Sequence, residues 1–563
     1  MQSRLLQLLL YLGVGICLSA QTLLKDINEP TEFGNESSNP LNWSALNDEL
    51  FIFSASDPIQ TAFLFASDGT EDGTIALGTV SAESNIIRLG DRAFFGGCDI
   101  FQGAEPCFEL YSSDGTPEGT GLFLEIGQGV FAGDVNNLVV GDSLFYFTAQ
   151  TAETGLEVWR SNGTLDGTYM VADINPGPGN GYAGELAVID DIAYYAGFTQ
   201  EAGEEPWRSD GTPEGTYMIV DLNEGSASAS PAFFTASGGF VYFSGLGTQT
   251  GRELRRTNGL PGNIQTFGEF SGSTDGSNPR ELIDSDGRLY YVAQGDMDAA
   301  GFDLHVFDHT GEPLHLDLAP SLPNIFPRAL MPFGNGEVVF NADAGNGREL
   351  WRSDGTIGGT HEIIDLYPGD SSGVFGTGTV GGSFFAYEDS LVYFAGTDGS
   401  VAQGEFVYEL FVTNGTAEGT DLISDQNPGG GGTNPGSFFQ FGNRLYFAAS
   451  DPEVGREPFY LQLSQPSSMF NPINELSTVV PPFPNPLPTG ASLQMELRLT
   501  ENIPLSAQFF NSSGQAVSAP VDYGSLSAGN HVIQFQTGDW PEGIYFLVLR
   551  SSYREKIFRL VLK

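Results

Sequence analysis

The chain has 563 residues, of which 71 are acidic and 22 basic, so its formal net charge is −49. This length fits several domains or one repeat array better than a single simple core. The negative charge argues against nucleic acid and anionic membrane as partners, because both would repel the protein. It favours cations or basic partners, and adaptation to a salty medium is the alternative explanation. The 74 glycines, 43 phenylalanines and 20 tyrosines are typical of short strands and turns.

The first twenty residues have the pattern of a secretion signal. Arg4 provides a positive charge, Leu5–Cys17 is an apolar run, and small residues lead up to Ala20. The run is too short to span a membrane comfortably. We therefore predict a signal peptide over residues 1–20, a secreted or cell-surface protein, and no membrane span in the mature form.

Two cysteines, Cys98 and Cys107, follow the predicted signal peptide. Both fall in one segment of an exported chain, where oxidising conditions favour disulfides. We predict a Cys98–Cys107 disulfide. An unpaired thiol or a metal site is the alternative, although few other ligands lie nearby in the sequence.

One phrase recurs along residues 21–465: an apolar strand, then Asp-Gly-Thr, then a second Gly-Thr. The copy at Gly347–Thr360 reads GRELWRSDGTIGGT, and successive copies lie 46 to 60 residues apart, which gives nine units. A repeat of this length indicates a solenoid, a propeller or an array. Further clear copies begin at Phe63, Phe108, Glu157, Glu205 and Glu409, and degenerate copies begin at Glu253, Asp303 and Glu457.

Each unit has the pattern of four short strands joined by Gly and Asn/Asp turns. Four strands per unit of this length predict an all-β fold, a β-propeller of about nine blades, with eight blades and one irregular unit as the alternative. The ninth unit has no evident fourth strand, whereas Thr22–Asn28 matches fourth strands such as Tyr169–Asn175. We predict that the N-terminal segment completes the last blade, which closes the ring and removes a free sheet edge.

Structural roles account for the residues of the phrase without any catalytic role. Asp and Gly of Asp-Gly-Thr suit a tight turn, in which Asp accepts backbone hydrogen bonds and Gly permits positive φ. The leading Glu349, with Arg348 or Arg352 nearby, is a candidate for a charge pair between blades. No residue is singled out as catalytic, and no phosphate loop or nucleophile elbow is present.

A second pattern, Asp-x-Asn, follows several fourth strands and precedes a glycine-containing loop. Alternating oxygen side chains before Gly can begin a calcium site, but calcium needs about six to eight oxygens and each loop offers two. Turn capping is therefore the favoured interpretation, and calcium binding is the alternative hypothesis. The candidate calcium ligands are Asp26, Asn28, Asp173, Asn175, Asp221, Asn223, Asp425 and Asn427.

The phrases ELWRSDGTIGGT and EPWRSDGTPEGT resemble the ELWxxDGT repeats of large secreted bacterial proteins. The resemblance covers residues 21–465. That family is defined by its repeat, so the resemblance implies no single biochemical activity.

Beyond the repeats, residues 466–482 are rich in Pro, Ser and Asn and are predicted to be a linker. Residues 483–563 have several short alternating strands, which predict a small Ig-like β-sandwich. From Thr478 onward six basic residues balance six acidic ones, so the negative charge belongs to the repeats.

This tail is similar to the C-terminal sorting domain of the type IX secretion system of Bacteroidota. The matching pieces are Phe483-Pro484-Asn485-Pro486, Ser513-Gly514, Gly543-Ile544-Tyr545 and the final strand that ends at Lys563. The resemblance implies that residues 483–563 engage the type IX secretion machinery of a Gram-negative bacterium. It also implies removal of the tail, with the protein released or held at the surface.

For function, the sequence favours a binding or adhesion module with an extracellular glycan or protein as its ligand. The alternative is a hydrolase of extracellular polysaccharide that uses carboxylates at the propeller mouth. Fold alone does not choose between them.

Overall fold

The computed structural model describes the chain in segments. These are residues 21–28, 37–56, 62–99, 108–127, 133–248, 250–267, 276–294, 301–311, 313–316, 326–374, 384–388, 390–397, 399, 408–424, 432–463, 471–472, 476–483, 492–499, 503–511, 517–519, 521–536, 540–541, 543–551 and 554–562. The described residues contain strands and no helix, which confirms the all-β class. They also contain no helix that is long and apolar enough to cross a membrane.

The described strands between Thr22 and Gln462 form nine antiparallel sheets in chain order. The first contains β2 (Leu41–Ala45), β3 (Phe51–Ser56), β4 (Ala62–Ser67) and β5 (Ile75–Ala76). The second contains β6 (Val80–Ala82), β7 (Ile87–Leu89), β8 (Arg92–Asp99), β9 (Glu109–Ser113) and β10 (Gly121–Leu124). The third contains β11 (Asn136–Val140), β12 (Phe145–Thr151), β13 (Gly155–Ser161) and β14 (Tyr169–Met170).

The next three sheets repeat the four-strand plan. The fourth contains β15 (Tyr182–Ile189), β16 (Ile192–Thr199), β17 (Gly203–Ser209) and β18 (Tyr217–Met218). The fifth contains β19 (Ala232–Ser237), β20 (Phe240–Gly247), β21 (Gly251–Thr257) and β22 (Gln265–Phe267). The sixth contains β23 (Arg280–Ser285), β24 (Arg288–Gln294), β25 (Phe302–Phe307) and β26 (Leu314–Leu316).

The last three sheets return to the start of the chain. The seventh contains β27 (Arg328–Pro332), β28 (Val338–Asp343), β29 (Arg348–Ser353) and β30 (His361–Ile364). The eighth contains β31 (Phe384–Tyr387), β32 (Leu391–Gly396), β33 (Glu409–Thr413) and β34 (Thr420–Ser424). The ninth contains β35 (Gly436–Phe441), β36 (Arg444–Asp451) and β37 (Gly455–Gln462), together with β1 (Thr22–Leu23).

The N-terminal strand β1 completes the ninth sheet, as predicted. Thr22 pairs with Tyr460 and Leu23 with Phe459 across the β1–β37 edge. The Leu24 amide then donates to the carbonyl of Pro458 at 2.8 Å, and the Leu24 side chain is buried. The two ends of the repeat array are therefore fastened within one sheet.

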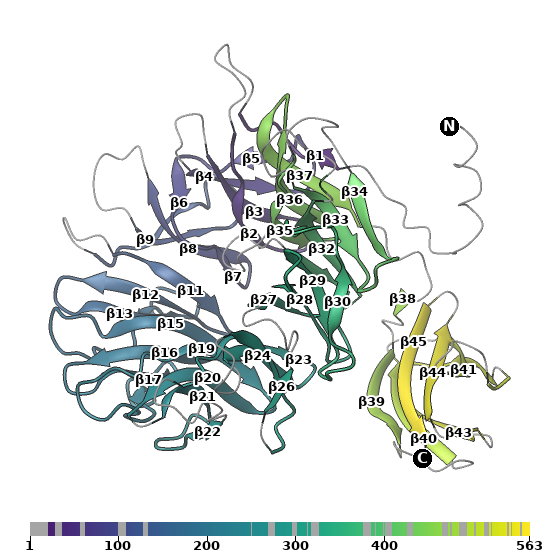
Figure 1. Ribbon diagram of the computed structural model, residues 1–563. Coiled ribbons are helices and arrows are strands. Elements are labelled where there is room, and N and C mark those ends of the chain that lie inside the picture. Colours follow the sequence, from purple (N-terminus) through teal and green to yellow (C-terminus); the bar gives the residue numbers. More distant parts are fainter. Residues whose placement is uncertain are drawn as a thin grey trace. The chain divides into compact units, whose positions relative to one another are not determined.

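The first strands of neighbouring sheets contact one another around a complete circle (Figure 1). In the second sheet β7 is counted as this strand, because β6 and β7 pair with successive parts of β8. The series of contacting strands is β2, β7, β11, β15, β19, β23, β27, β31 and β35, and β35 contacts β2 again. A circle of antiparallel sheets of this kind is a β-propeller. Because adjacent strands run in opposite directions, the first and third strands of each sheet begin on the same face, here called the front face.

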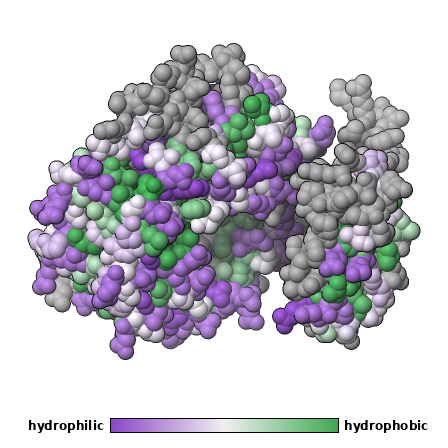
Figure 2. Space-filling model, turned by 90° about the horizontal axis from the view of Figure 1, so that it is seen from below, coloured by the Kyte–Doolittle hydropathy of each residue, from purple (hydrophilic) through white to green (hydrophobic). Residues whose placement is uncertain are grey.

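Aromatic residues of the second strands fill the space between adjacent sheets. Strands β12, β16, β20, β24 and β36 each carry five consecutive buried residues, because both faces of a second strand lie against a neighbour. One such cluster joins the fifth and sixth sheets through Tyr242, Phe267, Leu289, Tyr291 and Phe307. This packing explains the high phenylalanine and tyrosine content. Hydrophilic residues dominate the surface of the propeller in the view of Figure 2.

Residues from Ser464 onward belong to a second compact unit. Its strands are β38 (Asn471–Pro472), β39 (Leu476–Phe483), β40 (Ser492–Leu499), β41 (Ile503–Asn511), β42 (Val521–Leu526), β43 (Gly529–Gln536), β44 (Gly543–Ser551) and β45 (Arg554–Leu562). They form a five-stranded sheet in the order β38-β45-β44-β41-β42 and a three-stranded sheet in the order β39-β40-β43. The sandwich that the sequence predicts after the repeats is thus present.

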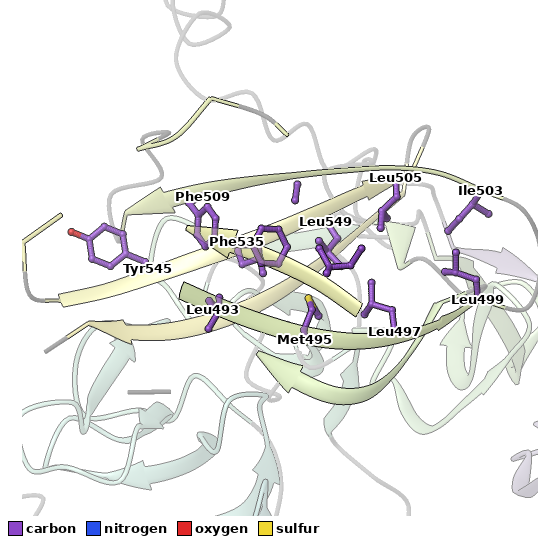
Figure 3. Packing of buried hydrophobic residues seen from close by; sticks show 13 residues of the cluster. Leu493, Met495, Leu497, Leu499, Ile503, Leu505, Phe509, Phe535, Tyr545 and Leu549 are labelled. Carbon is purple, nitrogen blue, oxygen red and sulfur yellow. The ribbon is translucent and has the colours of Figure 1, made fainter. Parts of the chain in front are cut away.

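The core of this unit consists of apolar side chains at alternate positions (Figure 3). Leu493, Met495, Leu497 and Leu499 of β40 are all buried, which is the period-two pattern of a strand with one face on a core. The opposite sheet contributes Leu505, Phe509, Tyr545, Leu547 and Leu549, and β43 adds Phe535.

The predicted linker over residues 466–482 is wrong in its second half. Strand β39 occupies Leu476–Phe483 and pairs with β40. Its prolines, Pro481 and Pro482, suggested a linker, but β39 is the edge strand of its sheet and its register shifts twice. An edge strand tolerates proline because one side of its backbone needs no ladder partner.

Candidate functional site

The Asp-Gly-Thr turn uses its polar side chains to hold itself together. In the seventh sheet the Asp354 carboxylate accepts from the backbone amide and the hydroxyl of Thr356 at 2.9 and 2.7 Å. The Thr360 hydroxyl donates to the Thr356 carbonyl at 2.7 Å and contacts Ser353 Oγ at the same distance. The Asp354–Thr356 pattern recurs at Asp68, Asp114, Asn162, Asp210 and Asn414.

These turn carboxylates are stabilised in their charged form. The hydrogen bond from the neighbouring threonine hydroxyl holds the pKa of Asp68, Asp114 and Asp210 below its ordinary value. A carboxylate that is committed to its own turn is a poor general acid or base. The turn is therefore a structural element in the described copies.

The glycine of the turn is required by the preceding sheet as well as by its own backbone. Gly355 has φ +83°, and a Cβ there would lie 2.9 Å from the Tyr290 hydroxyl oxygen of the sixth sheet. At Gly69 a Cβ would lie 2.5 Å from the Tyr446 hydroxyl oxygen of the ninth sheet. Arg288 crosses the same boundary and donates to the Asp354 carbonyl at 2.6 Å. The turn thus docks onto the neighbouring sheet.

The leading glutamate binds backbone amides, so the predicted charge pair with Arg348 or Arg352 is wrong. Glu349 accepts from the amide of Leu366 at 2.9 Å and from that of Gly373 at 2.7 Å. These amides lie in the connection to the next sheet, 17 and 24 residues further along. Arg352 pairs with Glu337 of its own sheet.

The same buried acceptor recurs at other sheet boundaries. Glu109 accepts from the Gly133 amide at 2.8 Å, and Glu205 from the Leu222 amide at 2.7 Å. Glu457 accepts from the Ile27 and Ser38 amides at 3.1 and 3.0 Å, which fastens the N-terminal segment. These carboxyl groups hold the connections between sheets in place.

Burial makes the glutamates at this position weaker acids than usual. It raises the pKa of Glu157 to about 8 and the pKa of Glu205, Glu349 and Glu457 to about 7. A raised pKa in a glutamate often marks a general acid. Here each side chain is at most 1 % exposed, so a substrate would not reach it.

Six of the eight predicted calcium ligands lie in described loops, while Asp425 and Asn427 lie outside the described residues. The asparagines cap their loops: the side-chain amides of Asn28, Asn175 and Asn223 donate to the carbonyls of Ser56, Asn180 and Ser228 at 2.8, 3.1 and 3.0 Å.

The aspartates of this pattern behave differently. Asp173 and Asp221 each accept one loop amide, from Gly177 and Gly225 at 3.2 Å, and the second carboxylate oxygen of each is buried without a hydrogen-bond partner. Asp26 lies at the equivalent place in the ninth sheet. The described residues contain no group of three or more acidic, histidine or cysteine side chains suited to a metal ion. Calcium binding stays a prediction, and the asparagine contacts support turn capping.

Cys98 is buried on β8 and forms a disulfide. Cys107 lies outside the described residues. The Cys98–Cys107 pairing therefore stays a prediction.

A cluster between the fifth and sixth sheets was not found from the sequence. The ring of His309 lies with Nε2 3.2 Å from Ser237 Oγ and Nδ1 2.9 Å from the Tyr242 hydroxyl, and Ser237 also donates to Asp284. In a serine nucleophile triad the carboxylate binds the imidazole. Here it binds the serine, the tyrosine takes the second ring nitrogen, and Ser237 is buried. The cluster joins two sheets.

A concentration of arginines on the front face was also missed. Arg348 begins the third strand β29, and Arg252 is the second residue of the third strand β21. Arg280 and Arg328 begin the first strands β23 and β27. Arg348 donates to the Phe326 carbonyl at 2.9 Å and to Asn341 Oδ1 at 2.6 Å. These four residues lie on three consecutive sheets of a strongly acidic propeller. The sequence signal was the repeated Pro-Arg, in which the proline precedes β23 or β27 and the arginine begins it.

No family model matches the chain, and no curated protein matches it. Among solved structures it is similar to a Mycobacterium tuberculosis puromycin-hydrolyzing peptidase (TM-score 0.36, 12% identity, 65% of this chain and 57% of that chain). It is also similar to prolyl oligopeptidase B from Galerina marginata (0.37, 9%, 82% and 56%) and to an oligogalacturonate lyase in complex with manganese (0.32, 12%, 76% and 99%). The chain spans less than three fifths of the length of the two peptidases.

Proposed function

We propose that this protein is an extracellular binding module: a nine-bladed propeller of the ELWxxDGT-repeat type that holds a glycan at its front face. The observation that carries the proposal is that the repeated residues of each unit are engaged in contacts that hold the ring together. The Asp, Gly and Glu of the phrase bind their own turn, the preceding sheet and the connection to the next sheet. They build a rigid ring and leave the front face to residues that differ between sheets.

We further propose that the unit from Ser464 onward is an address for export by the type IX secretion machinery. Three observations support this: the sequence pieces shared with sorting domains, the separate core of that unit, and its balanced charge beside an acidic propeller. Under this proposal the ligand is met outside the cell, at the surface or after release.

The binding proposal is tested with the mature chain, residues 21–563, on a glycan array run beside a polysaccharide hydrolysis screen. We expect retention of at least one glycan class without release of reducing ends. Reducing ends released at a steady rate would instead show that the protein is a hydrolase. An array without any retained glycan would overturn the proposal.

The export proposal is tested by removing residues 483–563 in the producing bacterium and following the protein in cell fractions. We expect the shortened chain to accumulate in the periplasm, because it lacks the address. Unchanged release into the medium would overturn the proposal.

A further inference from the structure

Two arginines occupy the same position on adjacent first strands of the propeller. Arg280 pairs with Val292 and Arg328 with Asn341, and in both strands the register shifts immediately afterwards. The next residues, Glu281 and Ala329, both have positive φ, +51° and +54°. This shared bulge and the contact between β23 and β27 place the two arginines as neighbours at the front end of the inner circle of strands.

The charges of these arginines are not balanced by an ion pair within the described residues. The ion pairs found there join His315 to Asp303 and Arg352 to Glu337. Burial lowers the pKa of Arg280, and the positive charge of Arg328 adds to this lowering. Two positively charged side chains are thus neighbours in a chain that has 22 basic residues and 71 acidic ones.

The carboxyl group of Glu281 lies close to the pair, and its position is set by the backbone. It accepts from the Leu330 amide at 3.5 Å, and burial raises its pKa despite the two nearby arginines. A single carboxyl group offsets at most one of the two positive charges. The third nearby arginine, Arg348, is engaged with Phe326 and Asn341.

Phe302 fixes the orientation of Arg280. The guanidinium carbon of Arg280 lies 3.4 Å from the centre of the Phe302 ring. A guanidinium stacked on an aromatic ring keeps its N–H groups at its edges, where a planar acceptor can bind with two parallel hydrogen bonds. Carboxylate is the planar acceptor that matches this fork.

We propose that Arg280 and Arg328 bind a carboxylate of a uronic-acid-containing oligosaccharide at the front face of the sixth and seventh sheets. This inference rests on the proposed glycan-binding function and names the ligand class. An extended polyanion would meet the repulsion of a propeller with a formal charge near −49, whereas one carboxylate on a sugar meets mainly the local pair. At physiological salt the screening length is about 8 Å, so the nearest charges dominate.

The test is calorimetric titration of the mature full-length chain with a β-1,4-linked hexasaccharide of five glucose residues and one glucuronic acid, here called the uronate hexamer, with cellohexaose as the neutral counterpart. We expect the uronate hexamer to bind and the neutral hexamer to bind at least tenfold more weakly. Arg280→Ala and Arg328→Ala should each weaken uronate binding about tenfold or more, which corresponds to about 1.4 kcal/mol. Arg280→Lys should recover only part of the loss, because lysine keeps the charge and loses the fork.

Arg88→Ala is the matched control. Arg88 lies on the first strand β7 of the second sheet and is exposed, and its side chain donates to the Gly90 carbonyl at 2.8 Å. Its removal changes the net charge by the same amount and should leave uronate binding within about twofold. Thermal midpoints of all variants check folding, and a variant that loses more than about 5 °C is replaced by the corresponding Gln.

The outcomes separate this inference from the function on which it rests. Glycans retained on the array with no preference for the uronate, or with no effect of Arg280→Ala and Arg328→Ala, would overturn the inference and leave the binding function standing. No glycan binding at all would overturn both. Stronger competition by inorganic sulfate than by free glucuronate, or tighter binding of a hexaglutamate peptide than of the uronate hexamer, would also overturn the inference.

Discussion

The seventh and sixth sheets of the propeller each pack a turn residue against the preceding sheet, but they use different residues. In the seventh sheet the turn glycine, Gly355, lies against the Tyr290 hydroxyl of the preceding sheet. In the sixth sheet His309 stands at this position with φ +68°, and its ring reaches Tyr242 of the fifth sheet. The space for that ring exists because the fifth sheet has Gly238 there; a Cβ on Gly238 would lie 2.5 Å from the ring.

The glutamate position differs between the same two sheets. Glu349 reaches backbone amides in the connection to the eighth sheet. The shorter Asp303 contacts His315 Nε2 of its own sheet at 3.1 Å. The Gly position of the phrase thus contacts the preceding sheet, and its change to His309 goes with Gly238 in that sheet. Degenerate copies differ in only some of these contacts, because Glu457, in another degenerate copy, still accepts from backbone amides.

The largest expected effect comes from the ninth sheet, whose fourth strand is supplied by β1. Deletion of residues 21–28 removes the β1–β37 pairing, the buried Leu24 and one amide partner of Glu457. With about 1 kcal/mol for each lost hydrogen bond and 1.5–3 kcal/mol for the leucine, we expect the thermal midpoint to fall by about 10 °C. A peptide of residues 21–28 added in trans should restore part of the loss. An unchanged midpoint would show that the ring closes without β1.

The contrast between Gly355 and His309 can be tested by substitutions in the seventh sheet and in the fifth and sixth sheets. Gly355→Ala adds a Cβ at positive φ and near the Tyr290 hydroxyl, so we expect a loss of about 1–3 kcal/mol. Gly238→Ala should destabilise similarly, because the new Cβ meets the His309 ring. The double variant Gly238→Ala/His309→Gly should recover much of that loss.

The free energy of unfolding is measured by chemical denaturation for wild type, Gly238→Ala, His309→Gly and the double variant. These four values give the coupling free energy between the two positions. Two residues in contact commonly show a coupling of about 0.5–3 kcal/mol. Additive losses would contradict the view that Gly238 exists to make room for His309.

A smaller, pH-dependent effect is expected at the buried glutamates. The Glu349 pKa is raised from 4.5 to about 7 by burial, so the folded protein holds a proton that the unfolded chain releases. Between these two pH values stability falls as pH rises, by up to about 1.4 kcal/mol per unit for each such group. Wild-type thermal midpoints should therefore fall from pH 5 to pH 8.

Glu349→Gln removes one of these titrating groups. It should be less stable than wild type at pH 5, because glutamine has one acceptor oxygen for two amides, at a cost of about 1–3 kcal/mol. The difference should shrink by pH 8, because wild type alone loses stability on the way. Glu418→Gln, at an exposed turn position, is the control without this effect. A difference that grows with pH would contradict the raised pKa.

The repeat made most of the fold predictable, because each strand of a unit is seen nine times in slightly different sequences. The ninth unit without a fourth strand, set beside Thr22–Asn28, even indicated how the ring closes. The partners of Glu349 were not predictable, since they are backbone amides 17 and 24 residues away that any residue provides. Prolines at 481 and 482 hid β39, because an edge strand accepts residues that a central strand rejects.

The residues of the proposed binding site were harder to predict for a related reason. Arg280 and Arg328 are candidates because they lie on adjacent strands, and this cannot be seen directly in the sequence, where 48 positions separate them. Only the repeated Pro-Arg, aligned unit by unit, could have brought them together. The carboxylates that the sequence pattern favoured instead proved to be committed to turns and to backbone amides.

The smallest expected effect concerns calcium, and it tests whether the Asp-x-Asn loops differ chemically from the Asp-Gly-Thr turns. Turn capping accounts for the asparagines, whose amides bind carbonyls of their own or an adjacent connection. Two side-chain oxygens per loop fall well short of the six to eight that calcium takes. We therefore expect chelator-treated protein to show a thermal midpoint within about 1 °C of protein in millimolar calcium. A rise of several degrees, lost in Asp173→Asn and Asp221→Asn, would instead assign the buried carboxylate oxygens of these residues as calcium ligands.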